Sequence, residues 1–307
     1  MKAWRLQQPG HLLQLEEIPT PKPGQGEVLV KVDAAGVTPT ELGWYPTTHE
    51  KSGNARTHAV PGHEFSGSIS ATGDRVSGVS IGEEIFGMND WFADGAAAEY
   101  CITRPQSIAP RPAKLTAIEA ASVPIGALTA WQGLFDRAKL QLGEQVLIHG
   151  GSGAVGVYAI QLAVWRGAKV VTTASSRNRE FLLGLGASQV IDYRTEHFEA
   201  MLDGIDVVFD AVGGETLEKS WRLLGSSGRM VTIASDSEGK MDDRTKAAFF
   251  IVEPNRTQLV KMGDMLASGV IQAVVDAVVP FAKTNAAYAG AISNRLGRGK
   301  VVVSMNN

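Results

Sequence analysis

The spacing of apolar and polar residues changes its period about one third of the way along the chain. Residues 27–36, EVLVKVDAAG, place valines at every second position, which is the period of a strand with one buried face. Short apolar runs bounded by glycine follow at residues 63–73, 82–88 and 96–103. Short strands with frequent Gly and Pro predict a compact antiparallel barrel or sandwich for this region.

Beyond residue 112 the pattern becomes helical and then alternates. Residues 116–138 have helical spacing, and Thr116 with Glu119 has the spacing of a capping box at their start. Helical stretches such as residues 155–166 separate strand-like apolar runs, which occur at residues 145–149, 168–174, 188–193, 204–213 and 228–235, with a sixth expected at 247–252. This alternation indicates a parallel sheet covered on both faces.

The two patterns predict an α/β protein of two domains. Residues 274–281 and 300–305 return to strand-like runs, and the simplest architecture places them with the first domain. We therefore expect a β-rich domain over residues 1–112, completed by 270–307, and a doubly wound parallel domain over residues 113–269.

The strongest local motif follows the expected strand at residues 145–149. Gly151, Gly153 and Gly156 form G-x-G-x-x-G and lead into an apolar helical run. In such a turn the glycines permit the tight bend, let the backbone approach a pyrophosphate and let the helix pack closely, while the helix N-terminus attracts phosphate. These glycines, with the intervening Ala154 and Val155, are predicted to bind a dinucleotide. The alternative is a glycine-rich turn without a ligand.

The tip of the next strand indicates which dinucleotide binds. An NAD site usually carries Asp or Glu at this point, but here the strand ends in Ser175, Ser176 and Arg177, and the first acid is Glu180. Hydroxyls and a guanidinium suit a 2′-phosphate, and the missing carboxylate removes its repulsion. The pattern predicts NADP(H) as the cofactor, unless Arg177 is only a solvated residue at the start of a helix.

His63 and Glu64 have the residue types of part of a zinc site. Catalytic zinc usually takes three protein ligands, and the only cysteine, Cys101, has no C-x-x-C partner. The other five histidines, His11, His49, His58, His149 and His197, do not show the usual zinc-site spacing among themselves. His49 and His58 lie near His63 in sequence, which leaves a loop site as an alternative. We therefore predict that no metal is bound, and we interpret His63 as a hydrogen-bonded polar residue of the cleft.

Composition narrows the classes of partner. A net charge of −3 gives no positive field for nucleic acid or an anionic membrane, so neither is an expected partner. No apolar run approaches the roughly 18 residues of a membrane span. The first ten residues lack the apolar run of a signal peptide, and a single cysteine cannot form an intrachain disulfide. The expectation is a soluble cytoplasmic protein that acts on a small molecule.

Several motifs follow one another in order along the whole chain: AAGVTPTELGWYP, PGHEFSG, GALTAW, VLIHGGSGAVG, GLGASQVIDYR, FDAVGG and GRGKVVV. Together they resemble the medium-chain dehydrogenase/reductase superfamily, in its zinc-independent quinone oxidoreductase (zeta-crystallin-like) branch. The resemblance implies a GroES-like catalytic domain from both chain ends and a Rossmann domain between them. It also implies that cofactor and substrate meet in the interdomain cleft, and that the protein is a homodimer.

The resemblance assigns further residues to the site. Thr38 stands where the superfamily's zinc enzymes have Cys and the zinc-independent branch usually has Asn, and it keeps a hydroxyl but no amide. The remaining carried-over cofactor positions are Thr129, Phe250, Ile251 and Val252 near the nicotinamide, Tyr193 near the 2′-phosphate, the backbone at Val212, and Arg298 or Lys300 from the last strand.

Three functions fit these features. We favour an NADPH-dependent reductase that transfers hydride to a quinone or an activated alkene or carbonyl, because a quinone can collect its proton from solvent without a catalytic triad. A 2-enoyl thioester reductase is the alternative, and it needs a donor such as Tyr45, unless Tyr45 only lines an apolar wall. The third is an NADPH-binding sensor or structural protein without turnover. Tyr45, Thr38 and His63 are the candidate catalytic residues.

Overall fold

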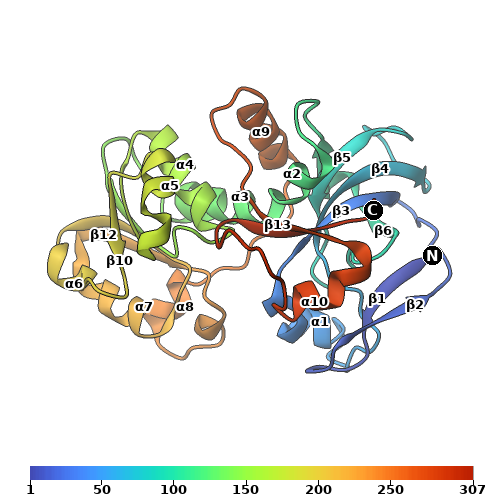
Figure 1. The fold of residues 1–307 in the computed structure, drawn as a ribbon, viewed down its shortest axis with the longest axis horizontal. Coiled ribbons are helices and arrows are strands. Elements are labelled where there is room, and N and C mark those ends of the chain that lie inside the picture. The colour runs from blue at the N-terminus through green and yellow to red at the C-terminus, as the bar shows by residue number, and fades with distance from the viewer. Residues whose placement is uncertain (307) are drawn as a thin grey trace. The chain divides into compact units, whose positions relative to one another are not determined.

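The structure is a computed structural model that describes residues 1–306, and these residues fall into two compact units. Unit 1 contains residues 1–125, 253–296 and those from 300 onward, and unit 2 contains residues 126–252 and 297–299. Both ends of the chain therefore belong to unit 1, as the blue and red ends of the colour scale in Figure 1 show.

Unit 1 is built on a seven-stranded sheet with the strand order β13-β14-β3-β4-β5-β7, in which β6 also pairs with β3. All of its pairs are antiparallel except β13 with β14. Its strands are β3 (Val28–Val37), β4 (Glu64–Thr72), β5 (Glu84–Met88), β6 (Tyr100–Thr103), β7 (Ile108–Pro110), β13 (Val275–Pro280) and β14 (Lys300–Ser304). A separate antiparallel pair joins β1 (Lys2–Leu6) to β2 (Leu13–Glu17).

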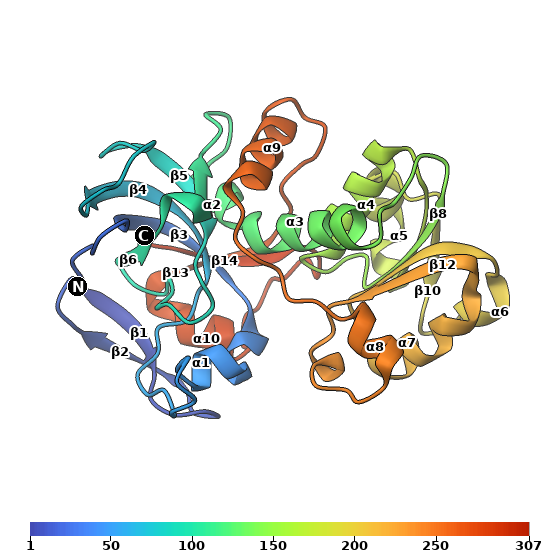
Figure 2. The same cartoon turned by 180° about the vertical axis from the view of Figure 1, so that it is seen from behind.

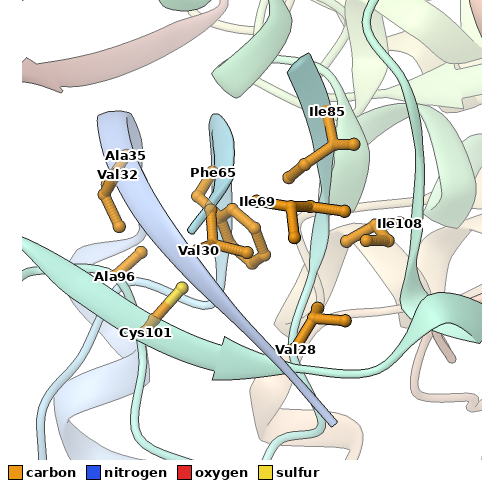
Figure 3. Close-up of a cluster of buried hydrophobic side chains, with 10 residues drawn as sticks. All are labelled: Val28, Val30, Val32, Ala35, Phe65, Ile69, Ile85, Ala96, Cys101 and Ile108. Atoms are coloured by element: carbon orange, nitrogen blue, oxygen red, sulfur yellow. The ribbon is translucent and has the colours of Figure 1, made fainter. Parts of the chain in front are cut away.

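The alternation in β3 places one set of its side chains in the core of unit 1. Val28, Val30 and Val32 are buried, and Figure 3 shows them beside Phe65 of β4 and Cys101 of β6. The Cys101 thiol is fully enclosed, and burial raises its pKa to about 12. The cysteine is therefore an apolar core residue rather than a nucleophile.

Short helices flank the sheet of unit 1. They are α1 (Tyr45–Thr48), α2 (Ala117–Ala121), α9 (Arg256–Ala267) and α10 (Thr284–Tyr288). The capping box predicted at Thr116 and Glu119 is present, with both of its reciprocal hydrogen bonds. The Arg256 guanidinium donates to the carbonyl oxygen of Ile108 at 2.7 Å, which joins α9 to β7. Because α2 and α9 pack on this sheet, residues 113–125 and 253–269 lie in unit 1, whereas the sequence pattern placed them in the second domain.

Unit 2 is a five-stranded parallel sheet with the order β10-β9-β8-β11-β12. The strands are β8 (Gln145–His149), β9 (Lys169–Ala174), β10 (Gln189–Asp192), β11 (Ile205–Asp210) and β12 (Leu224–Thr232). The helices are α3 (Pro124–Trp131), α4 (Gly156–Arg166), α5 (Arg179–Gly184), α6 (Phe198–Met201), α7 (Gly214–Ser220) and α8 (Asp243–Ala248). Figures 1 and 2 show α4 and α5 on one face of this sheet and α7 and α8 on the other. The predicted α/β class, with a β-rich part and a doubly wound parallel part, is confirmed.

The sixth strand expected at residues 247–252 is wrong. Asp242 accepts a hydrogen bond from the Thr245 amide and starts α8, so the two alanines of that run are helical. Phe249 then forms a single parallel bridge to Thr232 at the end of β12, and the chain leaves the sheet. An apolar run of this length does not distinguish a buried helix end from a strand, and the helix cap decides the outcome.

Candidate functional site

The glycine-rich turn of unit 2 has the geometry that its sequence predicts. Gly150 has a φ of +76°, a conformation that glycine adopts without strain, directly after β8. A Cβ on Gly151 would overlap the Thr172 hydroxyl, and one on Gly156 would overlap the Gly150 carbonyl oxygen. Gly153, by contrast, is exposed at the tip of the turn. The inner glycines thus pack turn, strand and helix together, and the outer one lies on the exposed surface of the turn.

Helix α4 begins at this turn without a polar cap. Its N-cap residue, Val155, gives no side-chain hydrogen bond to the first helical turn, and Ala154 before it is partly exposed. The helix runs for 11 residues and ends at Gly167, as predicted, with a φ of +82°. Uncapped N–H groups and the positive end of the helix dipole are an anion-binding arrangement.

A segment from the far end of the chain docks on the same turn. The Gly299 amide donates to the Ser152 carbonyl oxygen at 2.9 Å, and Gly153 and Gly299 form a parallel bridge. The Asn178 side-chain amide donates to the Gly297 carbonyl oxygen at 3.1 Å. Residues 297–299 therefore fix the glycine-rich turn and the tip of β9 with respect to each other. Sequence reasoning missed this contact, although the glycines on both sides of Arg298 were a signal for close backbone approach.

The tip of β9 carries the basic groups expected there. Arg177 is exposed, and a Cβ on Gly297 would overlap its guanidinium, so only glycine lets the guanidinium lie against this backbone. The Arg298 guanidinium lies 4.1 Å from the centroid of the Phe181 ring. Tyr193 is 58% exposed, at the end of β10. The structure brings these side chains together around the neighbouring ends of β9 and β10.

One acid at this strand tip was not predicted. Asp192 pairs with Ala174 in the register of β10 and β9, and its carboxylate accepts hydrogen bonds from the amides of Arg194 at 3.0 Å and Ser176 at 2.9 Å. These hydrogen bonds hold the pKa of Asp192 below its usual value. Both carboxylate oxygens are thus bonded to backbone amides. The search along β9 alone missed this residue because it lies on the neighbouring strand.

The nicotinamide-side positions carried over from the family are mostly buried in unit 2. Thr129 lies in α3 and is 4% exposed, and Phe250 and Val252 are also buried. The Arg137 guanidinium lies 5.5 Å from the centroid of the Phe250 ring. Val212, after β11, is half exposed, and its amide donates to the Asp210 carboxylate at 3.0 Å. Only Val212 among these four presents a large side-chain surface to solvent.

In unit 1, His63 belongs to a buried hydrogen-bonded cluster with Glu41 and Tyr288. His63 Nδ1 lies 2.5 Å from Glu41 Oε2, while Glu41 Oε1 accepts from the Tyr288 hydroxyl at 2.6 Å and from the Gly62 amide at 3.1 Å. Burial, reinforced by the adjacent Glu41 carboxylate, raises the pKa of Tyr288 well above its usual value. The interpretation of His63 as a hydrogen-bonded polar residue fits this geometry, although its partners come from outside its own segment.

Glu64 and Thr38 both contact the buried side chain of Lys300. Lys300 Nζ lies 2.5 Å from Glu64 Oε1 and donates to Thr38 Oγ1 at 3.0 Å. Glu64 Oε2 accepts from the Ile125 amide at 3.0 Å. Burial raises the pKa of Glu64, and Lys300 and the Ile125 amide oppose that rise. A Cβ on Gly36 would come within 2.5 Å of Glu64 Cγ, so Gly36 makes room for this carboxylate beneath β3.

Tyr45 lies in an aromatic cluster at the surface of unit 1. Its ring stacks on His49 with centroids 4.3 Å apart and meets the edge of Phe92 at 6.5 Å. The ring centroids of Trp91 and Trp44 lie 5.1 Å apart. Tyr45 is 49% exposed, and its hydroxyl makes no hydrogen bond within residues 1–306. The stacked ring is a side wall for an apolar or aromatic ligand.

Comparison with known proteins agrees with this architecture. An alcohol dehydrogenase GroES-like domain matches residues 24–113, and a domain described as zinc-binding dehydrogenase matches residues 185–303. A 2-methylene-furan-3-one reductase of Solanum lycopersicum is 33% identical over 92% of this chain and 73% of its own. An NADPH-dependent alkenal/one oxidoreductase, chloroplastic, of Arabidopsis thaliana is 31% identical over 99% of this chain and 79% of its own. The solved quinone oxidoreductase from Coxiella burnetii is 30% identical, with a TM-score of 0.90 over 100% of this chain and 99% of its own.

The chain belongs to the quinone oxidoreductase branch of the medium-chain dehydrogenase/reductase superfamily. It is therefore a member of a family of oxidoreductases that bind a nicotinamide dinucleotide. The glycine-rich turn of unit 2 fits such a group, because Gly153 is exposed and the positive end of α4 carries no side-chain cap. No helix within residues 1–306 is both long and apolar enough to cross a membrane.

One of the matched domains is described as zinc-binding, but Thr38, His63 and Glu64 of this oxidoreductase do not form a set of ligands that suits zinc. Thr38 offers no thiolate, and the Lys300 ammonium already takes the place of a cation beside Glu64. His63 Nδ1 faces Glu41, so this histidine has one ring nitrogen, Nε2, without a hydrogen-bond partner among residues 1–306. Residues 1–306 contain no group of three or more His, Cys, Asp or Glu that could hold a metal ion.

The alternative loop site at His49 and His58 has no common centre in the structure either. His49 Nδ1 lies 2.9 Å from Thr48 Oγ1, and its ring is covered by Tyr45. His58 Nδ1 lies 3.8 Å from Glu16 Oε1, on the β1–β2 side of the unit. Each histidine thus has separate local contacts, and none of those contacts is another histidine.

Proposed function

We propose that this protein is a zinc-independent, NADPH-dependent oxidoreductase that transfers hydride to a quinone or to an activated alkene or carbonyl. The observation that carries the proposal is the combination of an open glycine-rich turn with exposed Arg177 at the tip of the next strand. The names of two relatives, an alkenal/one oxidoreductase and a 2-methylene-furan-3-one reductase, favour conjugated carbonyl acceptors.

The preference for NADPH rests on the charges at the ends of β9 and β10. Arg177 and Arg298 supply guanidinium groups there, and Ser175 and Ser176 supply hydroxyls. The Asp192 carboxylate at this strand tip would oppose a 2′-phosphate, but its oxygens already accept hydrogen bonds from two backbone amides. A charged hydrogen bond contributes about 1.5 to 3 kcal/mol, which is roughly a 10- to 100-fold preference.

The reaction needs little covalent chemistry from the protein. A nicotinamide dinucleotide held at the glycine-rich turn would supply hydride to the acceptor carbon, and the electron pair displaced from the conjugated system would collect on the carbonyl oxygen. A proton then adds from solvent, which completes the two-electron reduction. The residues of the chain would position the acceptor and stabilise the developing oxyanion. Tyr45 is proposed as an aromatic wall in this scheme, and His63, which is 2% exposed, as a buried support for Glu41.

Substitution of Arg177 tests the cofactor proposal. Arg177→Gln should lower kcat/KM for NADPH by about 10- to 100-fold while leaving kcat/KM for NADH within about twofold. Arg222→Gln is a matched control, because Arg222 is an exposed arginine in a different part of unit 2. Equal losses for both cofactors in Arg177→Gln, or an NADH preference in the wild-type protein, would contradict the assignment.

Three further expectations remain proposals. A homodimer follows from the family resemblance and is tested by light scattering of the purified chain. Cytoplasmic location is tested by fractionation. If NADPH binds but no quinone or enone oxidises it, assays with enoyl thioesters come next, and failure there would favour a sensor function.

A further inference from the structure

The Lys300 side chain is buried at the start of β14, where it contacts Glu64 at the start of β4 and Thr38 directly after β3. Its relative exposure is 5%, and the Glu64 side chain beside it is fully buried. Nζ lies 2.5 Å from Glu64 Oε1 and 3.0 Å from Thr38 Oγ1. All three residues belong to unit 1, so this arrangement is defined within one compact unit.

The chemistry of an ammonium group fixes the role of the Thr38 hydroxyl. A charged lysine has three N–H donors and no acceptor, so Thr38 Oγ1 must accept from it. The single O–H proton of Thr38 must then point elsewhere. No hydrogen bond donated by this hydroxyl occurs within residues 1–306, and Thr38 is partly exposed. An accepted charged hydrogen bond also polarises the hydroxyl and makes it a stronger donor.

Glu64 explains why the cation is stable in this position. An isolated buried ammonium would be costly, and the adjacent carboxylate offsets that cost. Glu64 is itself held by the Ile125 amide at 3.0 Å, with Gly36 leaving space for its side chain. The carboxylate, the ammonium and the hydroxyl thus form a chain of contacts that starts in the core and ends at the surface of the unit.

We propose that Thr38 donates a hydrogen bond to the carbonyl oxygen of the acceptor substrate, and that Lys300, held by Glu64, is the positioning residue that directs this hydroxyl. The inference deepens the proposed function and rests on it: hydride addition to an enone places negative charge on that oxygen, where a fixed donor lowers the barrier. Thr38 contacts the substrate, while Lys300 acts only through Thr38.

Substitutions at Thr38 test the donor. With a small α,β-unsaturated ketone and saturating NADPH, Thr38→Val should lower kcat at least about tenfold, whereas Thr38→Ser should keep kcat within about threefold. Thr57→Val, at an exposed threonine, is the matched control. The Kd of NADPH, measured by its fluorescence, should not change in any of these variants. An unchanged kcat in Thr38→Val, or a loss confined to the Kd of NADPH, would overturn the proposal.

A second set of variants tests the positioning role of Lys300. Because removal of one charge leaves the other buried, the pair is replaced together, as Glu64→Gln with Lys300→Met. This double change should lower kcat about as much as Thr38→Val, and it should have less than a twofold further effect in the Thr38→Val background. Fully additive losses would show that the pair supports the fold and does not act through Thr38.

An infrared measurement separates failure of this inference from failure of the proposed function. A saturated ketone with the NADP⁺ form is the product complex of enone reduction, and it persists because the reverse hydride transfer is unfavourable. Its carbonyl stretch should shift to lower frequency in wild type and Thr38→Ser but not in Thr38→Val. If the wild-type protein oxidises no NADPH, the proposed function fails, while the infrared shift still decides whether Thr38 binds a carbonyl oxygen. Identical stretches in all three proteins would overturn the Thr38 assignment.

Discussion

His149 provides a quantitative prediction about stability and pH. It ends β8, directly before the glycine-rich turn, and it is fully buried. Its Nε2 lies 2.9 Å from Ser220 Oγ, and its Nδ1 lies 3.0 Å from Thr173 Oγ1. Ser220 gives its only proton to the Thr216 carbonyl oxygen at 2.6 Å, so Ser220 must accept from His149 Nε2–H. Nε2 of the ring therefore carries a proton.

Burial lowers the pKa of His149 to about 4, from 6.5 in the unfolded chain. A histidine whose folded pKa is depressed contributes stability above its unfolded pKa and loses that contribution as pH falls toward its folded pKa. The full contribution of His149 to the free energy of unfolding is about 3 kcal/mol, and about 2 kcal/mol of this contribution is lost between about pH 7 and about pH 5.

The assay compares urea unfolding of wild type and His149→Gln across this pH range, monitored in unit 2. Other titrating groups cancel in the difference between the two proteins. Between about pH 7 and about pH 5, the free energy of unfolding of the wild type should fall by about 2 kcal/mol more than that of the variant. Parallel pH profiles for the two proteins would refute the reasoning, because they would mean that His149 binds no extra proton on unfolding.

The remaining predictions concern the turn, the buried carboxylate and the aromatic wall. Gly151→Ala should abolish NADPH binding in a fluorescence titration, because the added Cβ overlaps the Thr172 hydroxyl. At Gly184 an added Cβ has no neighbour within 4 Å, so Gly184→Ala should raise the free energy of unfolding in urea by up to about 1 kcal/mol. Glu41→Ala should cost about 3 to 5 kcal/mol in urea unfolding, since it leaves buried polar partners unpaired; a cost below about 1 kcal/mol would contradict the cluster. Tyr45→Phe should keep kcat within about threefold in the enone assay, because its hydroxyl has no partner and its ring provides the contact; a 100-fold loss would instead support a proton donor.

Local signals predicted the elements of this fold well. The capping box at Thr116 depends on residues three positions apart, and the turn at Gly151 depends on a strand, three glycines and a helix that are contiguous in sequence. Such features are determined by neighbouring residues, so a single sequence contains them. The run at 247–252 shows the limit of this reasoning, because α8, which starts at the Asp242 cap, takes in the first two residues of that apolar run.

The site was predicted less completely because its partners are distant in sequence. Tyr288 reaches Glu41 across 247 residues, and Lys300 reaches Thr38 across 262. Asp192 approaches the tip of β9 only through the parallel register of β10. Neither periodicity nor spacing within a segment encodes these contacts, since they depend on how strands are ordered in each sheet.

The measurement that tests the central proposal most directly follows nicotinamide absorbance with a simple quinone and a simple enone, with and without a metal chelator. We predict that NADPH is oxidised at least about ten times more efficiently than NADH, by the estimate for one charged hydrogen bond, and that the chelator changes neither rate. Loss of activity on chelation would restore His63 as a metal ligand and contradict the zinc-independent proposal. Preference for NADH would contradict the role of Arg177, and failure to oxidise either cofactor would contradict the reductase itself.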